Sequence, residues 1–257
     1  MSELTLLLNA AEQRVQFGLV RDDVLICGQD WAAASQGAEL LAPALSDALA
    51  RTALSPGDVT RIACVTGPGG FTGIRLALAT ASALHHALGI PLAGIEYLHL
   101  IAQSIPLLPG QQVRVLTHAR RNLLHRQDFV SGVNGVVAAV GEPCVVALEQ
   151  ALDELDTSGP YPALLAGSGV GRYHELSAPD HSGIVSLGGR YAFPSWQAFM
   201  LLAETAPYEH ADLTPLYLRA SEAEDNLELL ASRRGDDPSC AREALDVLLH
   251  AAPTSLV

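Results

Sequence analysis

Apolar residues are spaced like strands over the first 26 positions of the chain. Leu4 to Leu8 form one continuous apolar run, Val15 to Leu19 alternate apolar and polar side chains, and Val24 to Ile26 are apolar again. A period of two, or a short apolar run between turn residues, is typical of strands. The pattern therefore predicts three consecutive strands.

Helical spacing begins at residue 37. Segments with apolar residues three and four positions apart predict helices, and the short apolar runs between them predict strands. The predicted helices are Gly37 to Leu54, Ile74 to Leu88, Glu96 to Ile105, Glu149 to Leu155 and Ser195 to Thr205. The predicted strands are Ile62 to Val65, Leu92 to Ile95, Val113 to Leu116, Phe129 to Val140 and Leu164 to Leu165. This alternation predicts an α/β fold.

The segment Pro106 to Gly110 interrupts the periodicity with two prolines and a glycine, so it is the candidate domain boundary. We expect a first lobe over residues 1–106 and a second over residues 107–220. After residue 220 the composition becomes polar and acidic, which predicts a tail over 221–257 with one or two short helices. No internal repeat is visible in the sequence.

Arginine supplies all 15 basic side chains, and the 257-residue chain has no lysine. This excludes a P-loop nucleotide site and lysine-based catalysis. The 28 acidic side chains give a formal net charge of −13, which disfavours nucleic acid as an unaided partner. Four distant cysteines indicate reduced thiols. The chain shows no signal-peptide pattern and no apolar stretch of membrane-spanning length, so we expect a cytoplasmic protein that does not bind membranes.

A glycine-rich segment, TGPGGFTGIR, joins a predicted strand to a predicted helix. Glycine permits positive φ angles, and the N–H groups at a helix N-terminus can bind an anion. The alternative is a tight strand-to-helix connection with Thr72 as the N-cap. The candidate anion site consists of Gly67, Gly69, Gly70, Thr72, Gly73 and Arg75.

The helix Ile74 to Leu88 is apolar almost all the way round and rich in alanine, so it must be covered on several sides. We expect this helix and the helix Gly37 to Leu54 to contact another chain. The alternative is that the second lobe covers them. The candidate interface residues are Leu41, Leu45, Ala48, Leu49, Ile74, Leu78, Ala81 and His85.

Side-chain patterns for catalysis or metal binding are not found in the sequence. His85 and His86 are adjacent, so they point to different faces of one helix, and arginines surround His118 and His125. Gly167 to Gly171 lacks the spacing of a nucleophile elbow and fits a turn. We therefore expect no catalytic residue, no metal and no cofactor.

Several segments resemble the bacterial TsaB (YeaZ-like) family. Residues 67–103, starting GPGGFTGIR, are similar to the family's GPGSFTGxR loop and small-residue helix. Pro215 to Arg219 is similar to the family's closing P-x-Y-L-R. Glu39 to Pro43 resembles a family helix start, and His118 to His125 stands where D-A-R-x-x-E-V-Y is usual. The resemblance covers about residues 4–220. It implies two lobes of the ASKHA (actin/ribonuclease H-like) fold, each a mixed sheet with flanking helices.

The resemblance also implies a function: a subunit of the machinery that makes N6-threonylcarbamoyladenosine at position 37 of tRNA. In that machinery TsaB pairs with the catalytic subunit TsaD, and the ATPase TsaE joins the pair. We expect a scaffold subunit without catalytic activity that contacts tRNA only through the complex and forms a homodimer when alone. The rival hypotheses are an ATP- or anion-dependent enzyme or peptidase that uses the glycine loop, and a direct tRNA binder.

Four departures from the family pattern bear on this choice. Leu8-Asn9-Ala10 replaces the usual I-D-T, so the carboxylate and hydroxyl that face phosphate in ASKHA enzymes are lost. Tyr97 and Ile101 align with the two metal-binding histidines of TsaD, and neither replaces histidine as a ligand. Gly37 and His118 replace a histidine and an aspartate, which could change the partner surface.

Overall fold

Two five-stranded mixed sheets form the framework of the protein. The computed structural model describes residues 3–32, 37–154, 163–177 and 183–218, with Ala231, Asp237 and Ser239. The chain divides into two compact units, Met1–Leu218 and Arg219–Val257. Everything below concerns the first unit. The short helices expected in 221–257 lie outside the described residues.

The first sheet has the strand order β3-β2-β1-β4-β5. β1, β2 and β3 form an antiparallel meander, and β4 and β5 follow in parallel beside β1. β1 is buried along its whole length because it is covered on both faces and lies in the middle of the sheet. The strands are β1 (Leu4–Asn9), β2 (Val15–Arg21), β3 (Val24–Trp31), β4 (Arg61–Gly67) and β5 (Leu92–Glu96).

The second sheet repeats this topology. Its order is β10-β9-β6-β7-β8, with β6, β7 and β8 antiparallel and β9 and β10 in parallel beside β6. The strands are β6 (Gln112–Arg120), β7 (Leu123–Ser131), β8 (Val137–Ala147), β9 (Ala163–Ala166) and β10 (Ile184–Ser186). The prediction of an α/β fold with two mixed ASKHA-type sheets is confirmed.

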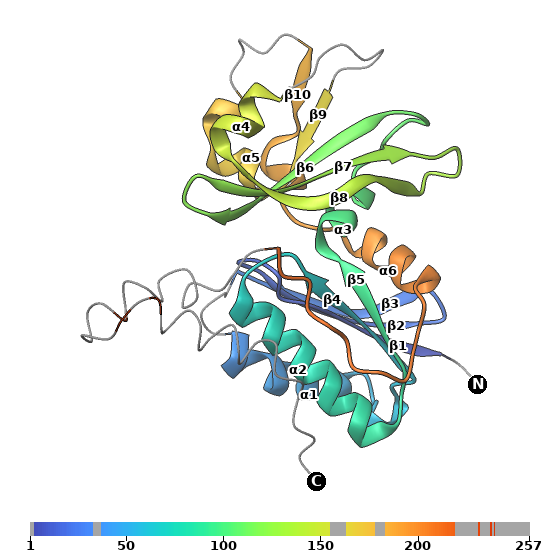
Figure 1. The fold of residues 1–257 in the computed structure, drawn as a ribbon. Coiled ribbons are helices and arrows are strands. Elements are labelled where there is room, and N and C mark those ends of the chain that lie inside the picture. The colour runs from blue at the N-terminus through green and yellow to red at the C-terminus, as the bar shows by residue number, and fades with distance from the viewer. Residues whose placement is uncertain are drawn as a thin grey trace. The chain divides into compact units, whose positions relative to one another are not determined.

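Helices cover both faces of each sheet (Figure 1). α1 (Gly37–Arg51) and α2 (Phe71–Leu88) lie on the outer face of the first sheet, and α3 (Tyr97–Gln103) and α6 (Trp196–Thr205) lie between the two sheets. α4 (Leu148–Asp153) and α5 (Ser168–Arg172) pack on the second sheet, which shares a third apolar cluster with them. Short 3-10 helices are η1 (Pro56–Asp58), η2 (His174–Ser177) and η3 (Gly188–Tyr191).

The ring of Trp196 lies close against the first sheet because two of the facing strand residues are glycines. A Cβ atom on Gly18 would lie 2.9 Å from the ring of Trp196, and one on Gly28 would lie 3.1 Å from it. The absence of side chains at these positions lets α6 approach the strands. The apolar core between the sheets is therefore continuous with both of them.

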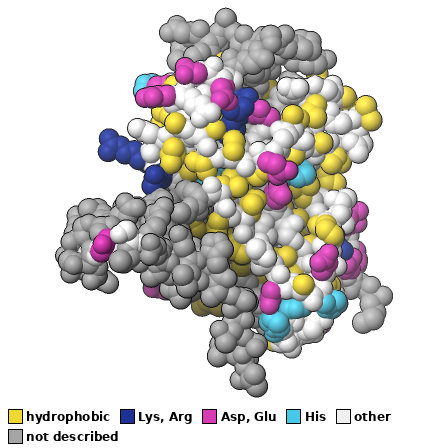
Figure 2. Space-filling view, viewed as in Figure 1, with side chains coloured by type: hydrophobic (Ala, Val, Ile, Leu, Met, Phe, Trp, Pro, Cys, Tyr) yellow, Lys and Arg dark blue, Asp and Glu magenta, His cyan; other side chains and the backbone are white. Residues whose placement is uncertain are grey.

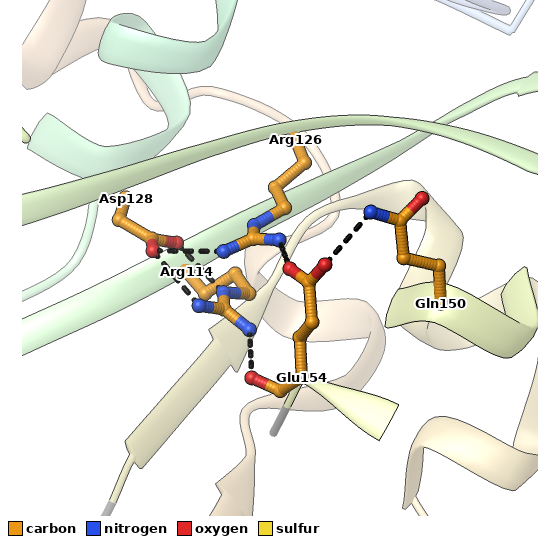
Figure 3. Close-up of polar contacts among 5 residues, drawn as sticks. All are labelled: Arg114, Arg126, Asp128, Gln150 and Glu154. Atoms are coloured by element: carbon orange, nitrogen blue, oxygen red, sulfur yellow. Dashed lines mark hydrogen bonds and ion pairs between the residues drawn. The ribbon is translucent and has the colours of Figure 1, made fainter. Parts of the chain in front are cut away.

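An ion-pair network joins α4 to the second sheet (Figure 3). Arg114 on β6 donates two hydrogen bonds to the carboxylate of Asp128 on β7, at 2.7 and 2.9 Å, and a third at 2.7 Å to the carbonyl of Glu154. Arg126 pairs with both Asp128 and Glu154, and Gln150 donates to Glu154. Two arginines and two carboxylates are thus held together at the end of α4.

The predicted elements of the first sheet match the structure, with helix ends shifted by up to three residues. In the second sheet the predicted strand Phe129 to Val140 is wrong, because Gly132 and Gly135 make a turn there between β7 and β8. The lobe boundaries stay a prediction. Residues 196–218, expected in the second lobe, pack on the first sheet: α6 contacts β1, β3 and β5, and Glu209 bridges to Leu92. None of the described helices is long and apolar enough to span a membrane.

Candidate functional site: the sheet junction and the outer helices

The glycine loop between β4 and α2 is filled by backbone from other parts of the chain. A Cβ atom on Gly69 would lie 2.0 Å from the carbonyl oxygen of Ala11, and one on Gly73 would lie 1.9 Å from that of Ala10. The N–H of Gly70 donates to the Ala11 carbonyl at 2.7 Å. Two carbonyl oxygens therefore occupy the N-terminus of α2, where a bound anion would need N–H donors.

Gly67 is required for a different contact. Its φ is +126°, a value that side chains disfavour, and a Cβ atom there would lie 2.6 Å from the carbonyl oxygen of Leu216. The N–H of Leu216 donates to the Thr66 carbonyl at 2.9 Å. The segment Pro215 to Arg219, singled out in the sequence, thus meets the glycine loop in space through Leu216.

The candidate anion ligands with side chains do not converge on an open site. α2 begins at Phe71 with Gly70 as its N-cap, so the assignment of Thr72 as the N-cap is wrong. The Nε atom of Arg75 donates to the Tyr217 hydroxyl at 3.1 Å, and the rings of Phe71 and Tyr217 lie 4.4 Å apart. The structure therefore favours the tight-connection interpretation of the loop over the anion site.

Asn9 stands at the end of β1, where the family pattern has an aspartate. Its side chain is buried: the amide nitrogen donates to Gln16 at 2.7 Å, and the amide oxygen accepts the N–H of Ala11 at 3.0 Å. Both polar atoms are thus used inside the β1–β2 turn. Such a side chain stabilises the turn and leaves no carboxylate there to hold a metal ion.

The two positions aligned with the metal-binding histidines of TsaD also hold side chains that are buried within the chain. Ile101 is in the core, and Tyr97 is buried with its hydroxyl donating to Glu12 at 2.9 Å. Among the described residues no group of three histidine, cysteine, aspartate or glutamate side chains could hold a metal ion.

Glu12, in the β1–β2 turn, reaches the second sheet. The hydroxyl of Ser168, at the start of α5, donates to one carboxylate oxygen at 2.5 Å, and Tyr97 donates to the other. Burial raises the pKa of Glu12 to about 7, against the opposing effect of these hydrogen bonds. A titratable group therefore lies at the junction of the two sheets.

The predicted interface residues require a correction. Seven of the eight side chains are buried within the chain itself, because the apolar faces of α1 and α2 pack on the first sheet, and Leu78 is half-buried. The buried residues are Leu41, Leu45, Ala48, Leu49, Ile74, Ala81 and His85. They support the helices from inside, and a partner would contact the opposite faces.

An alanine stripe runs along the outward face of α2, which also exposes larger polar side chains. Ala79, Ala83 and Ala87 are exposed and four residues apart, so they form one stripe along the helix. Beside it, α1 exposes Ala42 and Ala50 at positions that face away from the sheet. We call these five alanines the outer alanine face.

One flank of α2 is covered by residues 209–217 of the same chain. Asp212 accepts hydrogen bonds from Ser82 at 2.6 Å and from His86 at 3.1 Å, and these donors lower the pKa of its carboxyl. His85 and His210 lie beside this pair, and histidines gather at the lower edge of the view in Figure 2. Residues 209–217 therefore provide part of the cover that the apolar helix α2 was expected to need.

The model of the family described as "TsaD: tRNA N6-adenosine threonylcarbamoyltransferase" matches residues 32–195. This is more than half of the chain. The chain belongs to this family. The matched residues include the glycine loop, α2, α3 and the whole second sheet described above.

Curated relatives and a solved structure are similar to this chain over most of its length. An uncharacterized protein of Mycobacterium tuberculosis is 30% identical over 85% of this chain and 92% of its own length. The tRNA threonylcarbamoyladenosine biosynthesis proteins TsaB of Escherichia coli and Bacillus subtilis are 26% and 28% identical over 70% and 71% of the chain, and 80% and 79% of their own lengths. YeaZ from Pseudomonas aeruginosa superposes with a TM-score of 0.68 at 20% identity, covering 84% of this chain and all of that one. The resemblance to TsaB (YeaZ-like) proteins is confirmed.

Glu12 is a residue of the sheet junction that the sequence did not reveal. It lies in a polar turn, AAEQR, in which a glutamate is expected to be solvated. Its partners Tyr97 and Ser168 are 85 and 156 residues away, and only the stacking of two sheets brings them together. The only related signal in the sequence was that Tyr97 replaces a metal-binding histidine of TsaD.

Proposed function

We propose that this chain is a subunit without catalytic activity of the machinery that forms N6-threonylcarbamoyladenosine on tRNA. It docks on a TsaD-like catalytic subunit through the outer alanine face. The two relatives of known role are named as tRNA threonylcarbamoyladenosine biosynthesis proteins, which supports this process. The docking and the absence of catalysis are our own inferences.

The main support for the proposal is that the positions expected to face phosphate or a metal are occupied by groups already bonded within the chain. Asn9 is used inside its own turn, Tyr97 is hydrogen-bonded to Glu12, and the N-terminus of α2 receives the carbonyls of Ala10 and Ala11. Groups that are already satisfied within the chain have nothing left to offer a nucleotide. We therefore propose that the chain contributes to the reaction by binding another protein through its surface.

The outer alanine face supplies a suitable surface. Alanine lets a second helix approach closely, and it loses no side-chain entropy on association. Ala83 lies near the middle of the stripe and is exposed, so the chain can be altered there without disturbing its core.

The test is copurification of a tagged chain with the TsaD-like protein of the same cell. Ala83→Arg places a charge in the docked surface, and we expect it to weaken the pair at least about 100-fold. Ala138→Arg makes the same change at an exposed alanine on β8 and should leave binding unchanged. Wild-type affinity in the Ala83→Arg variant, with normal circular dichroism, would show that this face is not the interface.

The further members of the assembly follow from the same proposal. A TsaE-like ATPase joins the pair, and tRNA is contacted only through the complex, because the net charge of −13 opposes binding by this chain alone. In the absence of TsaD the same face forms a homodimer. Because the proposed function is a modification of tRNA, we propose that the chain acts in the cytoplasm.

One observation favours the rival hypothesis of an ATP- or anion-dependent enzyme or peptidase. Ser168 lies 2.5 Å from Glu12, and a serine hydroxyl beside a carboxyl group is one arrangement for activating a nucleophile. Two assays on the isolated chain decide between an enzyme and a subunit without catalytic activity. They are calorimetry with ATP and Mg²⁺ and a peptide-hydrolysis assay. Tight ATP binding or turnover that is lost in Ser168→Ala would favour the enzyme.

A further inference from the structure

Four exposed arginines lie at one edge of the second sheet. The strands β6, β9 and β10 run parallel to one another, so their carboxyl ends meet at the same edge of the sheet. α5 follows β9 at this edge, and η3 follows β10. We use the name arginine edge for four exposed residues: Arg120 at the end of β6, Arg121 in the β6–β7 turn, Arg172 at the end of α5 and Arg190 in η3.

Hydrogen bonds hold the three segments of the arginine edge together. The N–H of Asn122 donates to the Tyr173 hydroxyl at 2.9 Å, and this hydroxyl donates to the carbonyl of Arg120 at 3.3 Å. At the other end of α5, the N–H of Gly167 donates to the carbonyl of Tyr191 at 3.1 Å. The β6–β7 turn and η3 are thus fixed at the two ends of α5, which is only about 8 Å long.

The charge of the arginine edge is balanced less completely than that of other arginines in the chain. Arg51, Arg61 and Arg114 each pair with a carboxylate at 2.6 to 2.7 Å. Within the described part of the chain, neither Arg121 nor Arg172 has a carboxylate at ion-pair distance. An exposed guanidinium group in this state keeps its charge and its donors for an anion from outside.

Acidic groups beside α5 are engaged within the chain. Glu175, in η2 directly after α5, pairs with His174 at 3.2 Å. At the start of α5, the carboxyl group of Glu12 accepts hydrogen bonds from Tyr97 and Ser168. These groups therefore do not pair with the arginine edge.

We propose that the arginine edge contacts the phosphate backbone of tRNA in the assembled complex. The choice of RNA rests on the proposed function, in which tRNA is the substrate of the assembly. Guanidinium groups match phosphate in geometry and charge, and phosphate contacts position a nucleic acid without reading its bases. Exposed arginines on a turn and two short helices suit such contacts, because these need no helix in a groove.

The arginine edge and the net charge of the chain are compatible. Four arginines do not outweigh a net charge of −13, so the chain alone should bind RNA weakly. In the complex, the arginine edge strengthens the hold on a tRNA that the partner subunit also binds. The edge belongs to the second sheet and the outer alanine face to the first, so both surfaces can be used at once.

Fluorescence anisotropy with labelled, unmodified tRNA tests the contact on the complex of the full-length chain with its TsaD-like partner. Affinity is measured between about 50 and 200 mM salt, because each phosphate contact adds about 0.7 to 0.9 to the slope of log affinity against log salt. The double variant Arg121→Gln/Arg172→Gln should lower this slope by about 1.5 and weaken binding about tenfold or more.

Two controls accompany the glutamine variant. Arg121→Lys/Arg172→Lys keeps both positive charges and should keep the wild-type salt slope. Copurification with the TsaD-like subunit should be unchanged in both double variants, because neither alters the outer alanine face.

The proposal is overturned if the glutamine variant has the wild-type salt slope, or if the lysine variant loses as much of the slope as the glutamine variant does. It is also overturned if the glutamine variant no longer copurifies with the TsaD-like subunit, since the arginine edge would then contact protein.

A failure of the proposed function gives a different result. If the wild-type chain does not pair with the TsaD-like subunit, the same variants are compared on the chain alone at about 20 mM salt, where screening is weak. Weaker tRNA binding by the glutamine variant would then still support the RNA contact. Equal binding by the wild type and the glutamine variant, or no binding by either, would overturn it.

Discussion

Single residues determine how closely separate parts of the backbone approach each other. In the glycine loop, Gly69 and Gly73 are needed because the carbonyls of Ala11 and Ala10 lie where their side chains would be. The sequence identified these glycines correctly as special positions. It could not show which group lies against them. A bound anion and a carbonyl oxygen both need a position without a side chain.

Gly73→Ala should therefore destabilise the chain. The new methyl group would meet the Ala10 carbonyl at 1.9 Å, and the shift needed to relieve that contact costs about 2 kcal/mol or more. The matched control in the same loop is Gly70→Ala, whose methyl group has its nearest neighbour at 3.8 Å, and which should cost about 1 kcal/mol or less. Urea denaturation gives both values, and equal effects of the two changes would contradict this account of the loop.

Elements were predictable where the periodicity was clear and local. The strands and helices of the first sheet follow from alternation and from the glycine and proline residues that end them. The β7–β8 hairpin was missed because Phe129 to Val140 contains valines on both sides of the Gly132–Gly135 turn, and these read as one strand. The residues predicted for the partner interface are buried within the chain itself, because an apolar stripe indicates burial without saying by what.

Asp128 lies between Arg114 and Arg126, the two arginines that also bond to Glu154 at the end of α4. Asp128→Ala would leave Arg114 and Arg126 facing each other without their shared carboxylate, and we expect a loss of about 1 to 3 kcal/mol in the free energy of unfolding. Glu149→Ala changes an exposed carboxylate on α4 itself and should have an effect below about 0.5 kcal/mol. Thermal or urea unfolding measures both. A small effect for Asp128→Ala would mean that the network in Figure 3 contributes little to stability.

At the scale of the whole molecule, two sheets share one topology without a visible sequence repeat. Both have an antiparallel meander followed by two parallel strands, yet the loops and helices between the strands differ in length, so no fixed period survives in the sequence. The ASKHA-type fold was predictable from the resemblance. The junction at Glu12 was not, since it depends on how the second sheet stacks on the first.

The packing of the two sheets also bears on the proposed function. The space between the sheets is filled by α3, α6 and the Glu12 junction, and the outer alanine face remains on the exposed side of the first sheet. This arrangement is the basis of our proposal that the chain acts by binding another protein.

The central claim is tested most directly by the N6-threonylcarbamoyladenosine content of tRNA in cells depleted of this chain, measured by mass spectrometry of the nucleosides. We predict that depletion lowers the modification, and that the wild-type chain and Ala138→Arg restore it while Ala83→Arg does not. An unchanged level of the modified nucleoside after depletion, or full restoration by Ala83→Arg, would contradict the account.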